Sequence, residues 1–150
     1  MDGLTYVREM RDHGTNYPPI GEFVHFAIRD VALGRIEVTG RPEERHYNPF
    51  GVVHGGFACT LMDLALGHVS VTMLPSMENA VVTTDLSVKY LRPLYASVGE
   101  VACVATVLHS GKTIIVAEAQ LRDQTGKLFA TAQSTCFIVP RHRDTRSAGP

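Results

Sequence analysis

The chain has 150 residues, and its 14 basic and 15 acidic side chains give a formal charge of −1. A chain of this length buries one core of ordinary size, so we expect a single domain over residues 1–150. The near-zero charge gives no support for a nucleic-acid partner or for an anionic membrane surface, and we predict neither.

No leader or membrane segment is expected. The first residues, MDGLTYVREMRDHG, lack the basic start, apolar centre and small-residue cleavage site of a signal peptide. The longest apolar region is interrupted by polar residues such as Thr60 and Asp63. We therefore predict a soluble, cytoplasmic protein. Its cysteines lie far apart in apolar runs and are expected to be reduced thiols of the core: Cys59, Cys103 and Cys136.

The first predicted elements are a short helix and two strands. An amphipathic helix is expected at 4–13, inside an N-terminal extension of residues 1–20. Two strands with a break near Gly34 are expected over 23–40, and a charged loop follows at 41–48. The stretch after this loop is the only long helical candidate.

The second half of the chain has the period-two pattern of strands. In VVTTDLSVKYLRP (81–93), the apolar residues fall on one face: Val82, Leu86, Val88 and Tyr90. Three further strands are predicted at 100–110, 112–123 and 127–140. Short links predict that the four strands form an antiparallel meander. The polar tail at 141–150 is expected to be disordered.

This order of elements predicts an α+β fold. A helix that is apolar nearly all round must be covered on most sides, and one curved antiparallel sheet would cover it.

Several familiar catalytic signatures are missing from the sequence. It has no G-x-S-x-G nucleophile elbow, H-E-x-x-H zinc helix, Walker phosphate loop or C-x-x-C pair. His46 and His54 bracket Asn48, but no third ligand has a suitable spacing, so no metal site is predicted.

The stretch NPFGVVHGGFACTLMDLALGH (48–68) carries the strongest candidates. If the helix begins near His54, its first turn offers unpaired N–H groups at Gly55 and Gly56, which suit an anion or a developing oxyanion. Asp63 lies roughly 10 to 12 Å further along the helix. A base must act within roughly 3 Å of its target, so Asp63 cannot serve an oxyanion at its own helix start. The spacing predicts a two-fold dimer with two composite sites.

Each of these residues also has a plainer interpretation. His-Gly-Gly alone is consistent with an ordinary helix entry, Asp63 with a core acid bonded to a local hydroxyl, and Asn48 with a turn before Pro49. Together they supply an oxyanion site, an acid and two orienting polar groups in one short segment.

The pattern resembles the hotdog-fold thioesterases of the phenylacetate-degradation (PaaI-like) family. The resemblance covers roughly residues 20–139 and includes the TTDLSVKYLRP segment at 83–93. Its motif consists of Asn48, Gly51, His54, Gly55, Gly56 and Asp63. It implies a long helix wrapped by an antiparallel sheet, a dimer or dimer of dimers, and hydrolysis of acyl-CoA with no cofactor, since coenzyme A is part of the substrate.

The resemblance also implies roles for single residues. The Gly55 N–H would hold the thioester oxygen with Gly56 beside the substrate, and His54 and Asn48 would orient the thioester and the water. Asp63 of the partner chain would be the general base or the nucleophile, and Thr83 would help to hold the water. A thiolate is a stable leaving group, so a carboxylate and an oxyanion site are enough for this chemistry.

Coenzyme A carries phosphates, so a small basic patch is expected at the mouth of the site. The candidates are Lys89, Arg92, Gly111, Lys112 and Thr113, for each of which an ordinary solvated surface position is an equal alternative. The acyl pocket is expected to involve apolar residues such as Phe57, Leu61 and Met73, which core packing would also explain.

Two other functions remain open at this point. The first is a hotdog protein that binds acyl-CoA without cleaving it. The second is a hotdog hydratase or dehydratase, although the spacing from Asn48 to Asp63 matches the thioesterases better. The sequence leaves the acyl group open between aromatic and short or medium aliphatic chains, and it does not distinguish a dimer from a tetramer.

Overall fold

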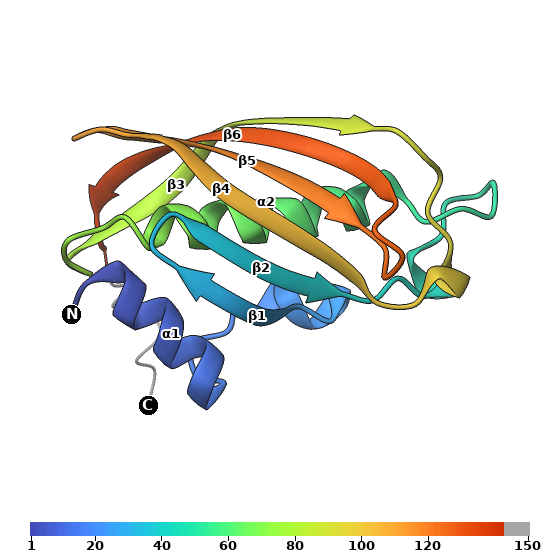
Figure 1. Ribbon diagram of the computed structural model, residues 1–150, viewed down its shortest axis with the longest axis horizontal. Coiled ribbons are helices and arrows are strands. Elements are labelled where there is room, and N and C mark those ends of the chain that lie inside the picture. Colours follow the sequence, from blue (N-terminus) through green and yellow to red (C-terminus); the bar gives the residue numbers. More distant parts are fainter. Residues whose placement is uncertain (143–150) are drawn as a thin grey trace.

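The computed structural model describes residues 1–142, and the predicted tail from residue 143 onward lies outside the described residues. Figure 1 shows one long helix lying against a curved sheet, with a second helix at the periphery. The helices are α1 (Gly3–His13) and α2 (Gly55–Val71), with short 3-10 turns η1 (Pro19–Val24), η2 (Glu44–His46) and η3 (Ala96–Val98). The strands are β1 (Ala27–Ala32), β2 (Arg35–Gly40), β3 (Asn79–Tyr90), β4 (Val101–Ser110), β5 (Ile114–Arg122) and β6 (Leu128–Pro140).

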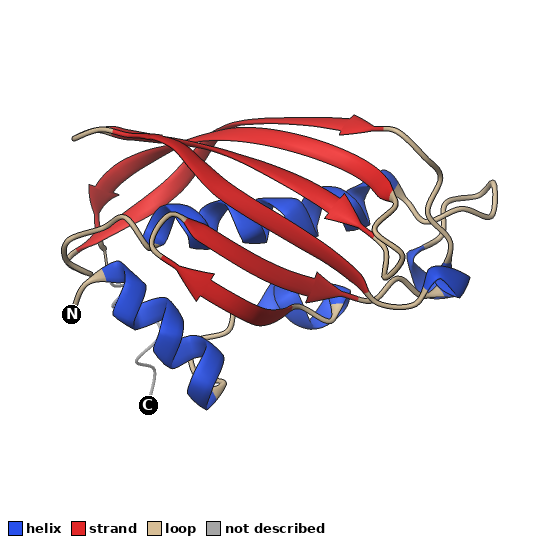
Figure 2. Cartoon of the chain, in the orientation of Figure 1, coloured by secondary structure: helices blue, strands red, loops and turns tan. Residues whose placement is uncertain are grey.

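The six strands form one antiparallel sheet, in the order β1-β2-β4-β5-β6-β3. Figure 2 shows the strands curving over one side of α2. The α+β hotdog architecture predicted from the sequence is thereby confirmed. No helix within residues 1–142 is long and apolar enough to cross a membrane.

The predicted four-strand meander is wrong in one respect. Strands β4, β5 and β6 do follow one another in the sheet, but β3 pairs with β6 at the opposite edge and does not touch β4. The link from Leu91 to Glu100 contains Pro93 and η3, so it is no tight hairpin and can carry the chain across. Among residues 1–142, strand β3 therefore has only one of its edges paired.

A bulge in β3 corrects the predicted face of Val82. Thr83 pairs with Cys136 while Asp85 pairs with Thr135, so Thr84 is an extra residue that reverses the alternation. Val82 consequently lies outside the core, 46% exposed, whereas Leu86 and Val88 pack against the core as predicted. The bulge also turns Thr83 toward α2.

Helix α2 has one side that is buried and one side that is partly open to solvent. The covered side packs into the sheet and consists of Phe57, Ala58, Leu61, Met62, Ala65, Leu66, Val69 and Ser70. The open side, which we call the open stripe, keeps partial access to solvent and includes Gly55, Gly56, Cys59, Thr60, Asp63, Leu64 and Gly67. The helix is therefore apolar nearly all round, but its own chain covers only part of it.

Helix α1 gives the N-terminal extension a structural role. Asp2 caps the helix by accepting a hydrogen bond from the Thr5 N–H at 2.9 Å, and Val7 and Met10 are buried in the core. At its start, Gly3 fits closely against the end of α2, because a Cβ there would lie 1.7 Å from the Val71 carbonyl oxygen. The N-terminal extension thus packs against the C-terminal end of α2.

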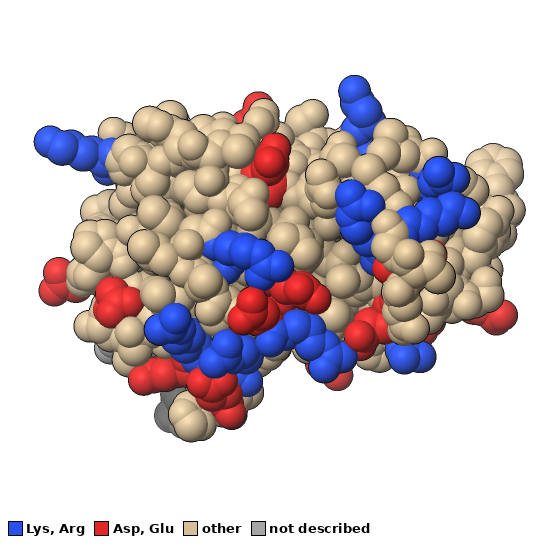
Figure 3. All heavy atoms as spheres, viewed as in Figure 1, with Lys and Arg blue, Asp and Glu red and all other residues tan. Residues whose placement is uncertain are grey.

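Charges of both signs are mixed over β1 and β2 in Figure 3. Arg35 pairs with Asp30 at 3.0 Å, and Arg29 pairs with Glu100 at 2.8 Å, all of them accessible to water. Such exposed pairs contribute little to stability. Because their charges are of opposite sign, this face has neither a positive nor a negative electrostatic potential overall.

His68 near the end of α2 is expected to make the protein less stable in acid. Its Nδ1 lies 2.6 Å from the Leu64 carbonyl oxygen and its ring packs on Phe26, and burial lowers the pKa of His68 below its ordinary value of 6.5. Below about pH 6.5, His68 therefore binds a proton more readily in the unfolded chain than in the folded chain. The contribution of His68 to the free energy of unfolding is fully present above about pH 6.5 and decreases as the pH falls below it. Urea unfolding between pH 7.5 and 5.5 should show a smaller loss for His68→Gln. An equal loss in both proteins would contradict this role, and His13→Gln, at an exposed histidine, is the control.

Candidate active site

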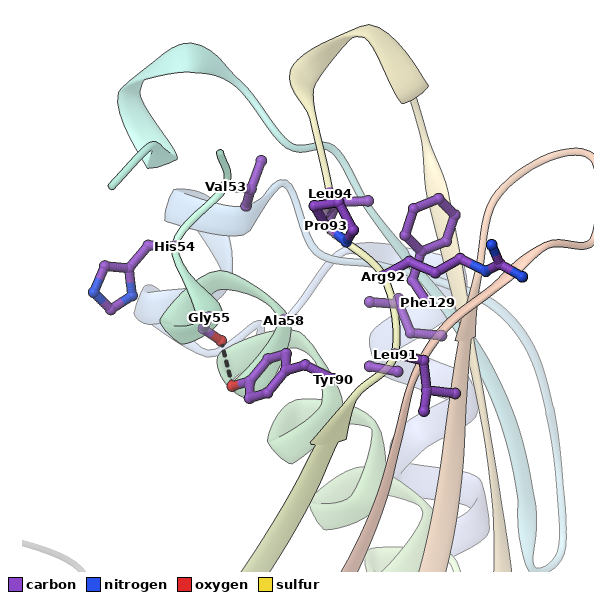
Figure 4. Close-up of a pocket in the computed structure, with 12 residues that line it drawn as sticks. Val53, His54, Gly55, Ala58, Tyr90, Leu91, Arg92, Pro93, Leu94 and Phe129 are labelled. Atoms are coloured by element: carbon purple, nitrogen blue, oxygen red, sulfur yellow. Dashed lines mark hydrogen bonds between the residues drawn. The ribbon is translucent and has the colours of Figure 1, made fainter. Parts of the chain in front are cut away.

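The start of α2 lies where the sequence predicts it, with His54 as the N-cap. The His54 Nδ1 accepts a hydrogen bond from the Gly56 N–H at 2.9 Å. A nitrogen that accepts from a backbone N–H carries no proton, so the neutral His54 ring has its proton on Nε2. His54 is exposed, and Figure 4 shows its ring pointing away from the neighbouring cavity. Its Nε2–H is thus available as a donor on the open side of the helix.

The same Gly55–Gly56 peptide is held at its other end by Tyr90. The Tyr90 hydroxyl donates a hydrogen bond to the Gly55 carbonyl oxygen at 2.7 Å (Figure 4). Its ring takes the place of a side chain on Gly55, because a Cβ there would lie 3.1 Å from the ring Cζ. Within residues 1–142 the Gly55 N–H has no acceptor, as expected for the first turn of a helix. It is the free donor of the helix start.

The loop before α2 is fixed from behind by His46. The buried His46 ring accepts from the Glu43 N–H at 2.8 Å through Nδ1, and its Nε2–H donates to the Phe23 carbonyl oxygen at 2.6 Å. Its own carbonyl oxygen accepts from the His54 N–H at 2.7 Å. His46 is therefore a structural histidine that anchors the entry to the helix.

Asn48 is a turn residue, which is one of the two interpretations suggested by its place before Pro49. Its Oδ1 accepts from the backbone N–H of Phe50 at 2.9 Å and of Val52 at 3.4 Å. Its amide NH₂ has no hydrogen bond among the described residues, so this half of the side chain remains available to a ligand. Asn48 can therefore both form the turn and orient a ligand.

Asp63 and Thr83 lie together on the open side of α2. The Thr83 hydroxyl donates to Asp63 Oδ1 at 3.0 Å, a contact made by the bulge in β3. Asp63 is half-buried, and its second carboxylate oxygen has no hydrogen bond among residues 1–142. The carboxylate is therefore oriented by one donor and keeps a free lone-pair face.

Replacing Thr83 tests this orientation. Thr83→Val removes the donor with little change of shape, and we expect kcat for the thioester hydrolysis that the sequence resemblance implies to fall about tenfold, in keeping with the loss of one hydrogen bond to a charged group. Thr83→Ser keeps the hydroxyl and should retain most of the activity. Steady-state kinetics of the two variants checks this, and equal kcat values for Thr83→Val and the unchanged protein would contradict it.

One chain holds both halves of the predicted site but does not bring them together. Gly55 and Asp63 both lie on the open stripe, eight positions apart, which corresponds to about 12 Å along the helix. Cys59 lies between them, and burial, followed by the Asp63 carboxylate, raises the pKa of its thiol. Cys59 is accordingly a neutral thiol and a poor nucleophile, while Cys103 and Cys136 are buried as predicted.

A cavity of about 370 Å³ opens directly beside Gly55. Its walls are largely apolar and come from the helix start, the end of β3 with the loop that follows it, and strands β5 and β6: Val53, His54, Gly55, Ala58, Tyr90, Leu91, Arg92, Pro93, Leu94, Leu121, Phe129 and Ala130 (Figure 4). The expected pocket residues Phe57, Leu61 and Met73 are not among them. Phe57 and Leu61 point into the core, where they are 3% and 0% exposed.

The predicted basic residues occupy three separate places in the single chain. Arg92 lies at the cavity, with its guanidinium directed outward in Figure 4. Lys89 lies with Glu118 and Gln133 in a shallow hollow away from that cavity. The turn formed by Gly111, Lys112 and Thr113 connects β4 and β5, and none of its residues lines the cavity. Within one chain they do not form a single patch.

Comparison with known proteins identifies the family of the chain. The family model for the thioesterase superfamily matches residues 50–130. Acyl-coenzyme A thioesterase 13 of Homo sapiens is 33% identical over 109 residues, which cover 70% of this chain and 74% of that protein. A Streptococcus mutans protein whose crystal structure contains acetyl CoA superposes with a TM-score of 0.69 at 25% identity, covering 79% of this chain and 91% of that one. The Escherichia coli PaaI protein, from the phenylacetic acid degradation operon, has the same fold, with a TM-score of 0.77 at 21% identity over 91% of this chain and 96% of that one.

The chain therefore belongs to the thioesterase superfamily. It is a thioesterase with the hotdog fold, as the resemblance in its sequence predicts.

Proposed function

We propose that this protein hydrolyses acyl-CoA thioesters at two sites, each shared between two copies of the chain. The observation that carries this proposal is the unused Gly55 N–H at the start of α2, with the Asp63 carboxylate about 12 Å away on the same open stripe. A free donor and a free carboxylate that cannot meet in one chain fit a site completed by a second chain.

Two features support a dimer in which the helices run antiparallel. The open stripe of α2 includes apolar Leu64 beside Asp63, and its own sheet covers it only in part. In the described part of the chain, strand β3 also leaves one edge without a partner strand, and such edges tend to pair with another strand. A two-fold axis beside both features would place Asp63 of each copy near Gly55 of the other. Further association into a dimer of dimers is compatible with this arrangement.

The proposed mechanism uses the free groups of each half-site. The Gly55 N–H, at the positive end of the helix dipole, donates a hydrogen bond to the thioester oxygen and stabilises the negative charge that develops there. The Asp63 carboxylate from the other copy, oriented by its Thr83, either removes a proton from the attacking water or attacks the carbonyl carbon to form a mixed anhydride, which water then hydrolyses to the free acid. The His54 Nε2–H and the Asn48 amide donate to the thioester or the water. Coenzyme A leaves as a thiolate, which needs no strong acid.

The acyl group is assigned to the cavity beside Gly55. Its walls are mainly aliphatic and aromatic, and the residues that line it include no carboxylate, so they suit an uncharged aromatic or aliphatic acyl group. The relatives named above support coenzyme A as the carrier, and Arg92 at the rim would meet the negatively charged end of the substrate.

A screen of turnover tests the proposal. The purified protein, with a panel of aromatic and straight-chain acyl-CoA thioesters, should release free thiol from at least one member, as followed with a thiol reagent. Tight binding of the panel without any release of thiol would contradict the proposal and would favour an acyl-CoA-binding protein.

A further inference from the structure

We propose that Tyr90 is a positioning residue of the oxyanion site and also forms a wall of the acyl cavity. The inference rests on the proposed function, because it assigns Tyr90 a part in the same reaction. It concerns a residue that the sequence pattern places only on the apolar face of a strand.

The first argument is that Tyr90 and His54 hold the two ends of one peptide unit. The Gly55 carbonyl oxygen accepts from the Tyr90 hydroxyl at 2.7 Å, and the Gly56 N–H of that peptide donates to His54 Nδ1 at 2.9 Å. Two consecutive glycines have more backbone freedom than any other pair of residues. The two hydrogen bonds fix the plane of this peptide and, through Gly55, the direction of the adjacent free N–H.

The second argument is that the Tyr90 ring fills the space beside Gly55. A Cβ on Gly55 would lie 3.1 Å from both the ring Cζ and the hydroxyl oxygen. The glycine and the tyrosine are therefore matched, since a Cβ at position 55 would force the ring to move by a few tenths of an ångström. Tyr90 is 52% exposed, and its partial burial raises the pKa of the hydroxyl, so it stays protonated and remains a donor at neutral pH.

The third argument is the place of Tyr90 between two parts of the site. In Figure 4 its ring lies between Gly55 and the side of the cavity formed by Leu91 and Phe129. Gly55 and Tyr90 both line the cavity, so an acyl group attached to a thioester at the Gly55 N–H would lie beside this ring as it enters. The ring therefore limits the length or width of the acyl group that fits.

The two roles are separated by two substitutions. Tyr90→Phe keeps the ring and removes the donor: we expect kcat to fall about tenfold with KM within about twofold, and the preferred acyl chain to stay the same. Tyr90→Ala removes the wall as well, so its preferred acyl chain should shift by two carbons or more toward longer chains. Tyr95→Phe, a partly exposed tyrosine on the next loop, is the matched control and should keep the kinetics of the unchanged protein.

Backbone amide exchange gives a readout that does not depend on turnover. Loss of the Tyr90 hydroxyl should speed hydrogen exchange at the Gly56 N–H by about tenfold while the exchange of the α2 core, such as Leu66, is unchanged.

The outcomes separate this inference from the proposed function. If the unchanged protein cleaves acyl-CoA but Tyr90→Phe has the same kcat and the same Gly56 exchange, the positioning role is overturned and the proposed function stands. An unaltered acyl preference in Tyr90→Ala overturns the role as a wall. If the unchanged protein cleaves no thioester, the proposed function fails, and the assignment of Tyr90 to the reaction fails with it.

Discussion

Asp63→Asn should lower kcat for acyl-CoA hydrolysis by about 10³-fold, which is about 4 kcal/mol of transition-state stabilisation. The amide has no negative charge and so can neither attack the thioester nor take a proton from water. It still has an oxygen that can accept the Thr83 hydrogen bond seen at 3.0 Å, so the local structure should remain. The measurement is the steady-state rate of thiol release at saturating substrate, together with the urea midpoint.

Asp85→Asn is the matched control for this prediction. Asp85 lies on the same strand as Thr83, but it follows the bulge and is exposed. Its substitution should leave kcat within about twofold, because a change at an exposed position that does not contact Asp63 has a small effect. An Asp63→Asn variant with the kcat of the unchanged protein would remove Asp63 from the mechanism.

Gly55→Val should have the second largest effect, a fall of about 10²-fold or more in kcat. Its branched side chain would push into the Tyr90 ring, which already lies 3.1 Å from the position of a Cβ. It would also crowd the approach of a thioester oxygen to the backbone N–H. Gly55→Ala needs a smaller displacement and should show an intermediate loss.

Circular dichroism and urea unfolding check that the loss in Gly55→Val is local. Position 55 is at the first turn of α2 and keeps partial access to solvent, so the core around Leu61 and Leu66 should be unaffected. Near-normal turnover in a folded Gly55→Val protein would contradict an oxyanion role for this N–H.

The periodic parts of the chain could be predicted well from the sequence. The strands at 100–110, 112–123 and 127–140 are bounded by short polar turns and alternate along their length, so local pattern alone defines them. The helix start at His54 follows equally from its two glycines and the apolar run behind them. Burial of one face against one core enforces these patterns, which is why they are visible in the sequence.

Features that depend on distant parts of the chain were not predictable in this way. The bulge at Thr84 breaks the alternation without any glycine to mark it, and it places Val82 outside and Thr83 beside Asp63. The pairing of β3 with β6 depends on where a long loop crosses the sheet.

The contact between Gly55 and Tyr90 could not be predicted from the sequence either. Tyr90 meets it across 35 positions of sequence, and only the folded chain shows that the ring fills the space left by the glycine. A tyrosine at the end of an apolar strand face is a weak signal, since its ring suits the core and its hydroxyl suits many partners.

The central claim is that each active site is shared between two chains, and mixing inactive variants tests it most directly. Asp63→Asn retains an intact Gly55, and Gly55→Val retains an intact Asp63. After the two proteins are unfolded together and refolded in equal amounts, half of the dimers should be mixed, each with one intact site, giving about a quarter of the full activity. Native mass spectrometry would confirm that mixed dimers have formed. If they form and the activity stays at the sum of the two variants, or if the active protein is a monomer, the shared site is wrong.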